Sequence, residues 1–396
     1  MKRESAGEIE GQAESATPAI VFGILLRDAV EEWAGRNQLL LALRRYTPIV
    51  LMERRAARER MPTPTIEQIS HNLYVIRSAL ALRTSRLGSR FSRFASKVDG
   101  GWFHRNLQSV GISEYVFWLT AANPVLAMGV SSDRLVYDCA DPNFLPETQT
   151  DFDIAESKIA TRAALTLSTA HSLHARMSVL NPKSFLLPNA TSRDFHPQST
   201  VGLPRPHSIE GRRGAIVGYL GTVDWRFDPA FVFAAAQALP ELTFAIVGRI
   251  NSDQSDGIAD LRQLPNVVMP GQVGYNEGRA WVAAFDIGII PFKINEMNDA
   301  INPVKMYMYL MGGLPVVATA IEECRINDFV QTASTPDEFT HLIRQATTNS
   351  PAADYQKRID FALRNTWEVR AREAVSLLEL NGLFPTITEQ TGYASE

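Results

Sequence analysis

The sequence has little cysteine, no long hydrophobic run and almost no net charge, and each shortage excludes a class of protein. Cys139 and Cys324 are the only cysteines among 396 residues, which argues against a disulfide framework or a zinc site and for a reducing compartment. No run of about 18 apolar residues occurs, so no segment is expected to span a membrane. A formal charge of −4 gives no reason to expect a nucleic-acid partner.

What the sequence does contain is typical of a globular protein with more than one core. Hydrophobic residues make up 45% and charged residues 21% of the chain, and a length of 396 residues favours two domains. Residues 1–17 are polar and rich in Glu, Ser and Ala. This composition predicts a disordered N-terminus rather than a signal peptide, and with the scarce cysteines it predicts a cytoplasmic location.

Positive charge is concentrated in one stretch. Residues 51–107 hold eleven Arg or Lys against four Asp or Glu, which suggests an anionic partner. Basic residues recur there every three or four positions, with hydrophobic residues on another side: Arg83, Arg86, Arg90, Arg93 and Lys97. Such a helix suits the anionic inner face of a membrane, although an ordinary surface helix over a core is slightly favoured.

Residues 298–319 read as a loop, a helix and a strand. Asn302 is expected to cap the helix, Pro303 suits its first turn, and the helix is predicted to run from Val304 to Met311. Glycines then end it before a short buried strand from Val316 to Ala318. The helix start and Lys305 together predict an anion site; the alternative is a capped helix with a solvated lysine.

Apolar runs alternate with helical segments along the whole chain, which predicts doubly wound α/β sheets. Strands are expected at 19–26, 48–52, 73–76, 115–119, 134–137, 165–168, 215–220, 242–248 and 286–291. Ligands meet the carboxyl ends of strands in such sheets. Asp28, Trp33 and Arg36 follow the first strand and are candidate acceptor contacts, although each alone is more often a surface residue.

Three segments carry a resemblance to the GT-B glycosyltransferases. The string from Asn302 to Thr319, N-P-V-K-x-Y-x-Y-L-x-x-G-x-P-V-V-A-T, resembles their sugar-nucleotide segment. Gly218, Tyr219, Gly221 and Asp228 reproduce their G-Y-x-G-x-x-x-x-x-x-D pattern, and residues 266–273 match N-V-x-x-x-G-x-V. The resemblance implies two Rossmann-like domains whose parallel sheets face a central cleft. Their expected limits are 18–200 for the acceptor domain, 201–214 for a linker, 215–365 for the nucleotide-sugar domain and 366–396 for a helix that crosses back.

The resemblance also implies a donor site without a metal or other cofactor. Lys305 inherits the contact to the donor diphosphate, whose charge it would neutralise as the diphosphate departs. The implied donor contacts are Gly221, Thr222, Arg249, Val273, Asn302, Pro303, Lys305 and Met308. Retaining relatives carry two glutamates where this chain has Ala300 and Met308. Inverting relatives, which resemble the xanthan glucuronosyltransferases, show a similar loss. The D-x-D of Asp151 and Asp153 is expected in a polar loop and to hold no metal.

Asp141 is the candidate catalytic base. The pattern Y-D-x-x-D from Tyr137 to Asp141 resembles the teichuronic-acid type of GT-B enzymes, and its second Asp aligns with the proposed base of the xanthan glucuronosyltransferases. Inverting transfer needs a carboxylate that takes the proton of the acceptor hydroxyl. The alternative is that Asp141 caps the turn before Pro142.

The predicted function is transfer of a sugar from a nucleoside diphosphate donor, most simply a UDP-sugar, to a glycan or a polyprenyl-diphosphate-linked acceptor. Three alternatives stay open at this point. The first is a retaining transferase on the same fold, in which Asp141 is structural. The second is a nucleotide-sugar epimerase, and the third is a binding module without catalysis.

Overall fold

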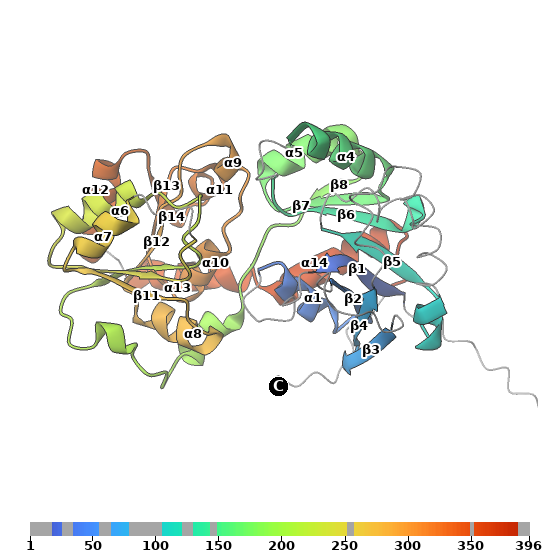
Figure 1. Cartoon of the computed structure of the whole chain (residues 1–396), viewed down its shortest axis with the longest axis horizontal. Coiled ribbons are helices and arrows are strands. Elements are labelled where there is room, and N and C mark those ends of the chain that lie inside the picture. Colours follow the sequence, from blue (N-terminus) through green and yellow to red (C-terminus); the bar gives the residue numbers. More distant parts are fainter. Residues whose placement is uncertain are drawn as a thin grey trace, which may run out of the picture.

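The computed structural model describes residues 18–25, 35–54, 65–78, 105–120, 130–142, 149–251, 257–348 and 352–386. They form two halves that lie side by side, each built on its own sheet (Figure 1). The predicted disordered N-terminus, the basic stripe from Arg83 to Lys97, and Asp28 and Trp33 lie outside the described residues.

The N-terminal half is built on an eight-stranded sheet with the order β3-β4-β2-β1-β5-β6-β7-β8. Its strands are β1 (Ala19–Leu25), β2 (Ile49–Arg54), β3 (Thr65–Ser70), β4 (Leu73–Ser78), β5 (Tyr115–Leu119), β6 (Leu135–Cys139), β7 (Leu165–Ser168) and β8 (Ser184–Leu186). All neighbours pair in parallel except β3 and β4. A tight turn joins those two strands, and Asn72 adopts the left-handed conformation there, with φ 54°. The sequence pattern did not predict β3.

Helices cover both faces of this sheet, which explains why its strands are continuously apolar. In β1, Ile20 and Phe22 pack in one cluster with residues of α1 (Asn37–Leu43) and α14 (Trp367–Leu380). Ala19 and Val21 point the other way, toward α4 (Gln149–Arg162) and α5 (His171–Leu180). Successive side chains of a strand alternate between faces, so a strand with two buried faces favours apolar residues at most of its positions.

The C-terminal half is built on a six-stranded sheet with the order β11-β10-β9-β12-β13-β14. Its strands are β9 (Ile216–Leu220), β10 (Thr243–Val247), β11 (Val267–Gly271), β12 (Ile287–Ile290), β13 (Val316–Thr319) and β14 (Val330–Ala333). Its helices are α6 (Pro229–Ala238), α7 (Ile258–Gln263), α8 (Tyr275–Ala284), α9 (Glu296–Asp299), α10 (Val304–Met311), α11 (Glu322–Arg325), α12 (Pro336–Thr348) and α13 (Ala352–Leu363). The strand order reverses between β9 and β12, where doubly wound sheets bind ligands.

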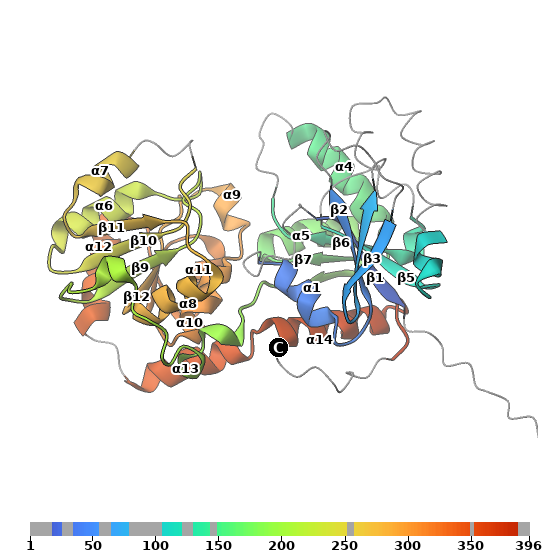
Figure 2. The ribbon, with the colours of Figure 1, turned by 60° about the horizontal axis from the view of Figure 1, so that its bottom comes forward.

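The C-terminal helix joins the two halves. Figure 2 shows α13 against the C-terminal half and α14, which follows it, lying along the N-terminal half. The Trp367 backbone N–H donates to the carbonyl of Thr191 over 3.1 Å, and Nε of Arg370 donates to the carbonyl of Pro188 over 3.1 Å. Trp367 is buried in the same cluster as β1, so hydrophobic burial adds to these hydrogen bonds.

A polar network built on Asn302 is the second link between the halves. Oδ1 of Asn302 accepts from the Asn189 backbone N–H over 3.0 Å, and Nδ2 donates to Glu323 over 2.6 Å. Glu323 also accepts from the backbone N–H of His171, over 2.7 Å. Asn302 therefore does not cap α10. Pro303 is the N-cap residue, and no side chain caps the helix.

Candidate active site

The turn after β9 brings a glycine against a lysine. Gly221 has a φ of +152°, a backbone conformation that side chains disfavour, and a Cβ there would lie 3.1 Å from Nζ of Lys305. Lys305 reaches this turn from the first turn of α10. The glycine thus leaves room for the ammonium at the carboxyl end of β9, beside the point where the strand order reverses.

In the part of the chain that the structure describes, no carboxylate forms an ion pair with the Lys305 ammonium. It lies 5.0 Å from the ring centre of Tyr219 and 4.9 Å from that of Phe292. Within the described residues its side chain makes no hydrogen bond or ion pair. Burial, together with the charge of Arg226, lowers the pKa of Lys305 to about 7, and the charge of Asp224 opposes this change. A bound anion would supply the missing partner and raise this pKa.

Arg226 is the second cation at this turn, and it is not among the residues that the sequence predicts for the site. Nε of Arg226 donates to Oδ1 of Asp224 over 2.9 Å, and a second guanidinium nitrogen pairs with Oδ2. The guanidinium carbon lies 5.7 Å from the ring centre of Phe292, the same ring that Lys305 faces. Its position could have identified Arg226 as a candidate, because it is a basic residue in the glycine-bearing turn that follows β9, and the same turn is predicted to bind the donor.

Asp141 belongs to the N-terminal half and lies close enough to Arg226 for that charge to affect its pKa. It follows β6 by two residues, is exposed to solvent and, within the described part of the chain, makes no hydrogen bond or ion pair. Although part of its side chain meets solvent, protein atoms surround the rest and displace water from it. This desolvation raises the pKa of Asp141 to about 6, while the charges of Arg226 and Arg36 oppose the rise. A carboxyl group with this pKa is ionised at neutral pH and can still accept a proton.

A buried ion pair fixes the strand end that carries Asp141. Asp138 is fully buried, and the guanidinium of Arg36 binds it through Nε over 2.9 Å and through a terminal nitrogen over 2.7 Å. The Trp118 indole N–H donates to the same carboxylate over 3.0 Å. The remaining guanidinium nitrogen donates to the carbonyl of Leu187 over 2.8 Å. Arg36 was predicted to contact the acceptor, but all three of its guanidinium nitrogens are engaged inside the protein.

The other predicted donor contacts divide into two groups. Thr222, Arg249 and Val273 lie on the loops after β9, β10 and β11, at one edge of the sheet; Arg249 is exposed there and the other two are half-buried. Pro303 and Met308 are buried, and Met308 is only 5% exposed within the hydrophobic core. Asn302 is also buried, and its side chain is bound to Asn189 and Glu323. The side chains of Asn302, Pro303 and Met308 are therefore not open to a ligand at Lys305. All of these donor contacts stay predictions: the loop residues lie where a ligand can reach them, and Pro303 and Met308 are buried.

The D-x-D motif lies in a helix and not in the polar loop that the sequence predicted. Asp151 and Asp153 lie in α4, and Asp153 is 3.9 Å from the guanidinium of Arg176. Across the described ranges, no three His, Cys, Asp or Glu side chains gather in a way that could hold a metal ion. None of the helices in those ranges is long and apolar enough to cross a membrane.

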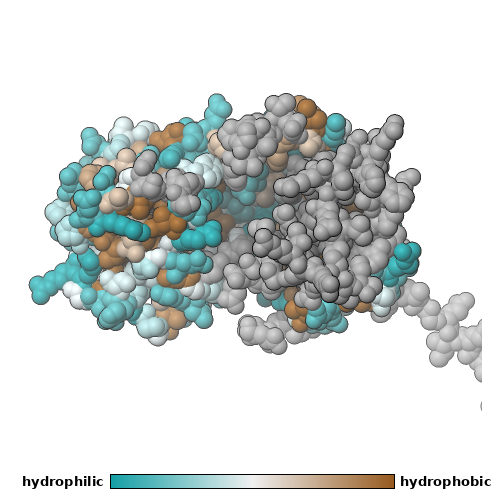
Figure 3. Space-filling view, in the orientation of Figure 1, coloured by the Kyte–Doolittle hydropathy of each residue, from teal (hydrophilic) through white to brown (hydrophobic). Residues whose placement is uncertain are grey.

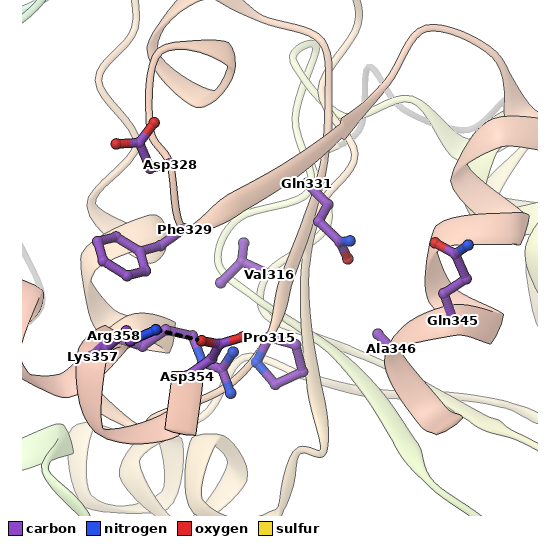
Figure 4. Close-up of a pocket in the computed structure, with 10 residues that line it drawn as sticks. All are labelled: Pro315, Val316, Asp328, Phe329, Gln331, Gln345, Ala346, Asp354, Lys357 and Arg358. Carbon is purple, nitrogen blue, oxygen red and sulfur yellow. Dashed lines mark hydrogen bonds and ion pairs between the residues drawn. The ribbon is translucent and has the colours of Figure 1, made fainter. Parts of the chain in front are cut away.

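A separate cavity of about 510 Å³ lies between β14, α12 and α13 (Figure 4). Lys357 pairs there with Asp354 over 3.2 Å, and Nε of Arg358 donates to the carbonyl of Gly313 over 2.8 Å. None of the residues predicted for the donor or the acceptor lines it. We therefore place the candidate active site at Lys305, Arg226 and Asp141.

Comparisons with known proteins agree with this architecture. No protein-family model matches the chain. The "Putative teichuronic acid biosynthesis glycosyltransferase TuaH" of Bacillus subtilis (strain 168) is 27% identical over 210 residues, which cover 50% of this chain and 53% of that protein. The match thus spans about half the length of this curated relative.

Two solved structures share the fold over nearly the whole chain. The Anabaena protein HepE in complex with UDP and glucose has a TM-score of 0.65 and 14% identity, covering 92% of this chain and 99% of that one. The trehalose-6-phosphate protein of E. coli bound with UDP-2-fluoro glucose has a TM-score of 0.66 and 10% identity, covering 91% and 99%. The predicted fold class is confirmed: the chain has the GT-B fold of two Rossmann-like halves, and half of its length is similar to a teichuronic-acid-type glycosyltransferase.

Proposed function

We propose that the protein is a glycosyltransferase that moves a sugar from a UDP-sugar to a glycan or lipid-linked acceptor in polysaccharide or glycoconjugate biosynthesis. The observation that carries the proposal is the Lys305 ammonium. It is half-buried at the carboxyl end of β9 and, within the described residues, makes no ion pair. A half-buried cation without a partner is costly, and a diphosphate supplies the charge that it lacks.

The donor diphosphate is proposed to lie between Lys305 and Arg226. When the bond between the anomeric carbon and the diphosphate oxygen breaks, negative charge grows on the departing UDP. Two cations already in place stabilise that charge without rearrangement, which lowers the barrier. The solved structures with UDP or a UDP-sugar derivative support the choice of nucleotide, and residues of the chain itself supply the positive charge.

Asp141 is proposed as the base. The acceptor hydroxyl attacks the anomeric carbon from the face opposite the leaving UDP, and its proton passes to the carboxylate of Asp141. The raised pKa of about 6 makes this carboxylate a better proton acceptor than an ordinary surface aspartate. Attack from the opposite face inverts the anomeric configuration.

A panel of UDP-sugars tests the proposal. The purified chain is incubated with each donor and with mixed glycan acceptors, and transfer is followed by the mass of one added sugar and by the release of UDP. We expect one donor to be turned over far faster than the others. A chain that binds no UDP in calorimetry, or that binds UDP and turns over none of the panel, contradicts the assignment as a transferase.

The configuration of the product separates the two transferase mechanisms. An α-linked UDP-sugar should give a β-linked product if Asp141 acts as the base, and proton NMR of the anomeric hydrogen reads this directly. An α-linked product would instead support a retaining enzyme without a protein base.

A further inference from the structure

A second groove begins beside Asp141 and runs along α5. It has a volume of about 720 Å³, within the range of about 300–1,000 Å³ that small-molecule sites occupy. Both halves of the molecule line it: α4 and α5 on one side and α9 on the other. Pro142, the residue after Asp141, lies at its wall. A molecule in the groove is therefore adjacent to the candidate base.

The groove follows one face of α5 over about 10 Å, because Leu173, Arg176 and Leu180 are spaced by three and four residues. Leu173 packs in the same hydrophobic cluster as Ala300, so the two halves touch at its floor. Val179 also lines the groove and is 86% exposed, which is unusual for a valine. A small group of hydrophobic residues is visible at the upper edge of the N-terminal half, where α4 and α5 lie (Figure 3).

The charges of the groove disfavour an anionic occupant. Arg176 is its only cationic lining residue within the described chain, and it is already paired with the buried Glu156 and lies 3.9 Å from Asp153. Asp153 and Glu296 leave the lining negative. A phosphate or a carboxylate placed there would meet repulsion and an engaged arginine. An uncharged group would meet mainly apolar side chains.

We propose that this groove holds the uncharged, apolar part of the acceptor, beyond the sugar that reacts at Asp141. The inference rests on the proposed glycosyl transfer and deepens it, because it assigns the acceptor's aglycone to α5 and α9. The acceptor then spans both halves, and its reactive hydroxyl is held at Asp141 by apolar contacts made further along the groove. The groove thus selects acceptors by the hydrophobic area next to the reacting sugar.

Two alkyl glucosides test this assignment on the full chain. Octyl β-glucoside and methyl β-glucoside carry the same sugar and differ only in apolar length. We expect octyl β-glucoside, below its micelle-forming concentration, to bind at least tenfold more tightly in a ligand-observed NMR titration, a gain that burial of about two methylenes already supplies. Equal affinities for the two glucosides would overturn the proposal.

Two matched valines localise the effect. Val179→Asp adds a charge to the groove and should remove most of the octyl advantage. Val201→Asp makes the same change at a residue that is 82% exposed and does not line the groove, and it should leave the advantage intact. Because both valines are exposed, neither change should impair folding. If both variants kept the advantage, the octyl chain would bind elsewhere and the assignment would be wrong.

Two further measurements test the charge and the second wall. Octyl phosphate should bind no more tightly than methyl β-glucoside, and tight binding of octyl phosphate would contradict the preference for an uncharged group. Met297→Asp, from α9, should weaken the binding of octyl β-glucoside as Val179→Asp does; an unchanged affinity would exclude α9 as a wall.

UDP is titrated into the same samples. Wild-type protein that binds UDP but does not distinguish the glucosides refutes the groove and leaves the proposed function standing, whereas failure to bind UDP counts against the proposed function itself.

Discussion

Two sets of charged side chains lie near the boundary between the halves, and they differ in whether a protein partner already compensates each charge. Asp138 and Arg36 form a buried pair in which the carboxylate is bound by the guanidinium and by an indole N–H. Asp141 and Lys305 are each affected by the charge of Arg226, and within the described residues neither side chain makes a hydrogen bond or an ion pair. The first set is complete without a ligand, and the second is not.

This contrast separates charged groups that stabilise the fold from charged groups that are available to a ligand. The buried pair of Asp138 and Arg36 holds the end of β6 in position. Removal of one partner leaves the other as an uncompensated buried charge. Unsatisfied charges keep shifted pKa values, about 6 for Asp141 and about 7 for Lys305. Groups whose pKa values are shifted close to neutral pH are expected where a site binds a charged ligand or transfers a proton. The following changes test this contrast.

Loss of the Asp141 carboxylate should have the largest effect. Asp141→Asn keeps the shape but cannot take the acceptor proton, so we expect the turnover number to fall by about 10²–10⁴-fold while UDP binding is unchanged. Asp133→Asn is the control, because Asp133 is exposed just before the amino end of the same strand. Steady-state release of UDP measures both variants. Full turnover in Asp141→Asn would show that no base is needed and favour the retaining mechanism.

Loss of Arg36 should act on stability instead. Arg36→Ala leaves the buried Asp138 without its cation, and we expect the free energy of unfolding to fall by about 3–5 kcal/mol. Arg134→Ala breaks an ion pair with Glu114 whose partners are 36% and 54% exposed, and it should cost no more than about 1 kcal/mol. Urea unfolding compares the two. Equal costs would mean that the buried pair contributes no more than a surface pair.

Loss of Lys305 should weaken UDP without weakening the fold. Lys305→Ala removes charge-assisted contacts worth about 1.5–3 kcal/mol, so we expect the Kd for UDP to rise by about 10–100-fold. Lys305→Met should not lower the thermal unfolding midpoint, because it removes a cation whose pKa burial has depressed. Lys357→Ala, at a surface ion pair, is the control in calorimetry. A lower midpoint for Lys305→Met would show that the lysine is structural.

The smallest expected effect is a pH dependence of UDP binding. Lys305 of the free protein has a pKa of about 7, so below pH 7 the ammonium is already charged. Above pH 7 it must take up a proton in order to bind a diphosphate, and the affinity should fall by up to about tenfold per pH unit. Calorimetry at pH 8 in two buffers with different ionisation enthalpies should show proton uptake. Uptake that persists in Lys305→Met would assign the proton to another group.

Local patterns predicted much of the fold. The sequence placed α10 at Val304–Met311 and two strands at residues 115–119 and 165–168, and the structure has those bounds. These elements carry strong local signals: glycines and a proline end the helix, and short apolar runs form strands buried on both faces. β3 was missed because it pairs antiparallel at the sheet edge, where its residues from Glu67 to Ser70 are exposed. Its pattern therefore lacks the apolar run that marked the others.

Local sequence patterns account for the α/β alternation, the helix that carries Lys305, and the carboxylate that follows β6, because strand and helix signals and turn residues act over a few neighbouring positions. Which charged side chains have a partner inside the protein depends on the packing of distant segments. Asn302 became a bridge between the halves, Arg36 a partner of Asp138, and Arg226 a neighbour of Lys305, through contacts between residues as much as 113 positions apart in the chain. Such long-range pairing depends on how two sheets and a crossing helix pack together, and no local pattern records it.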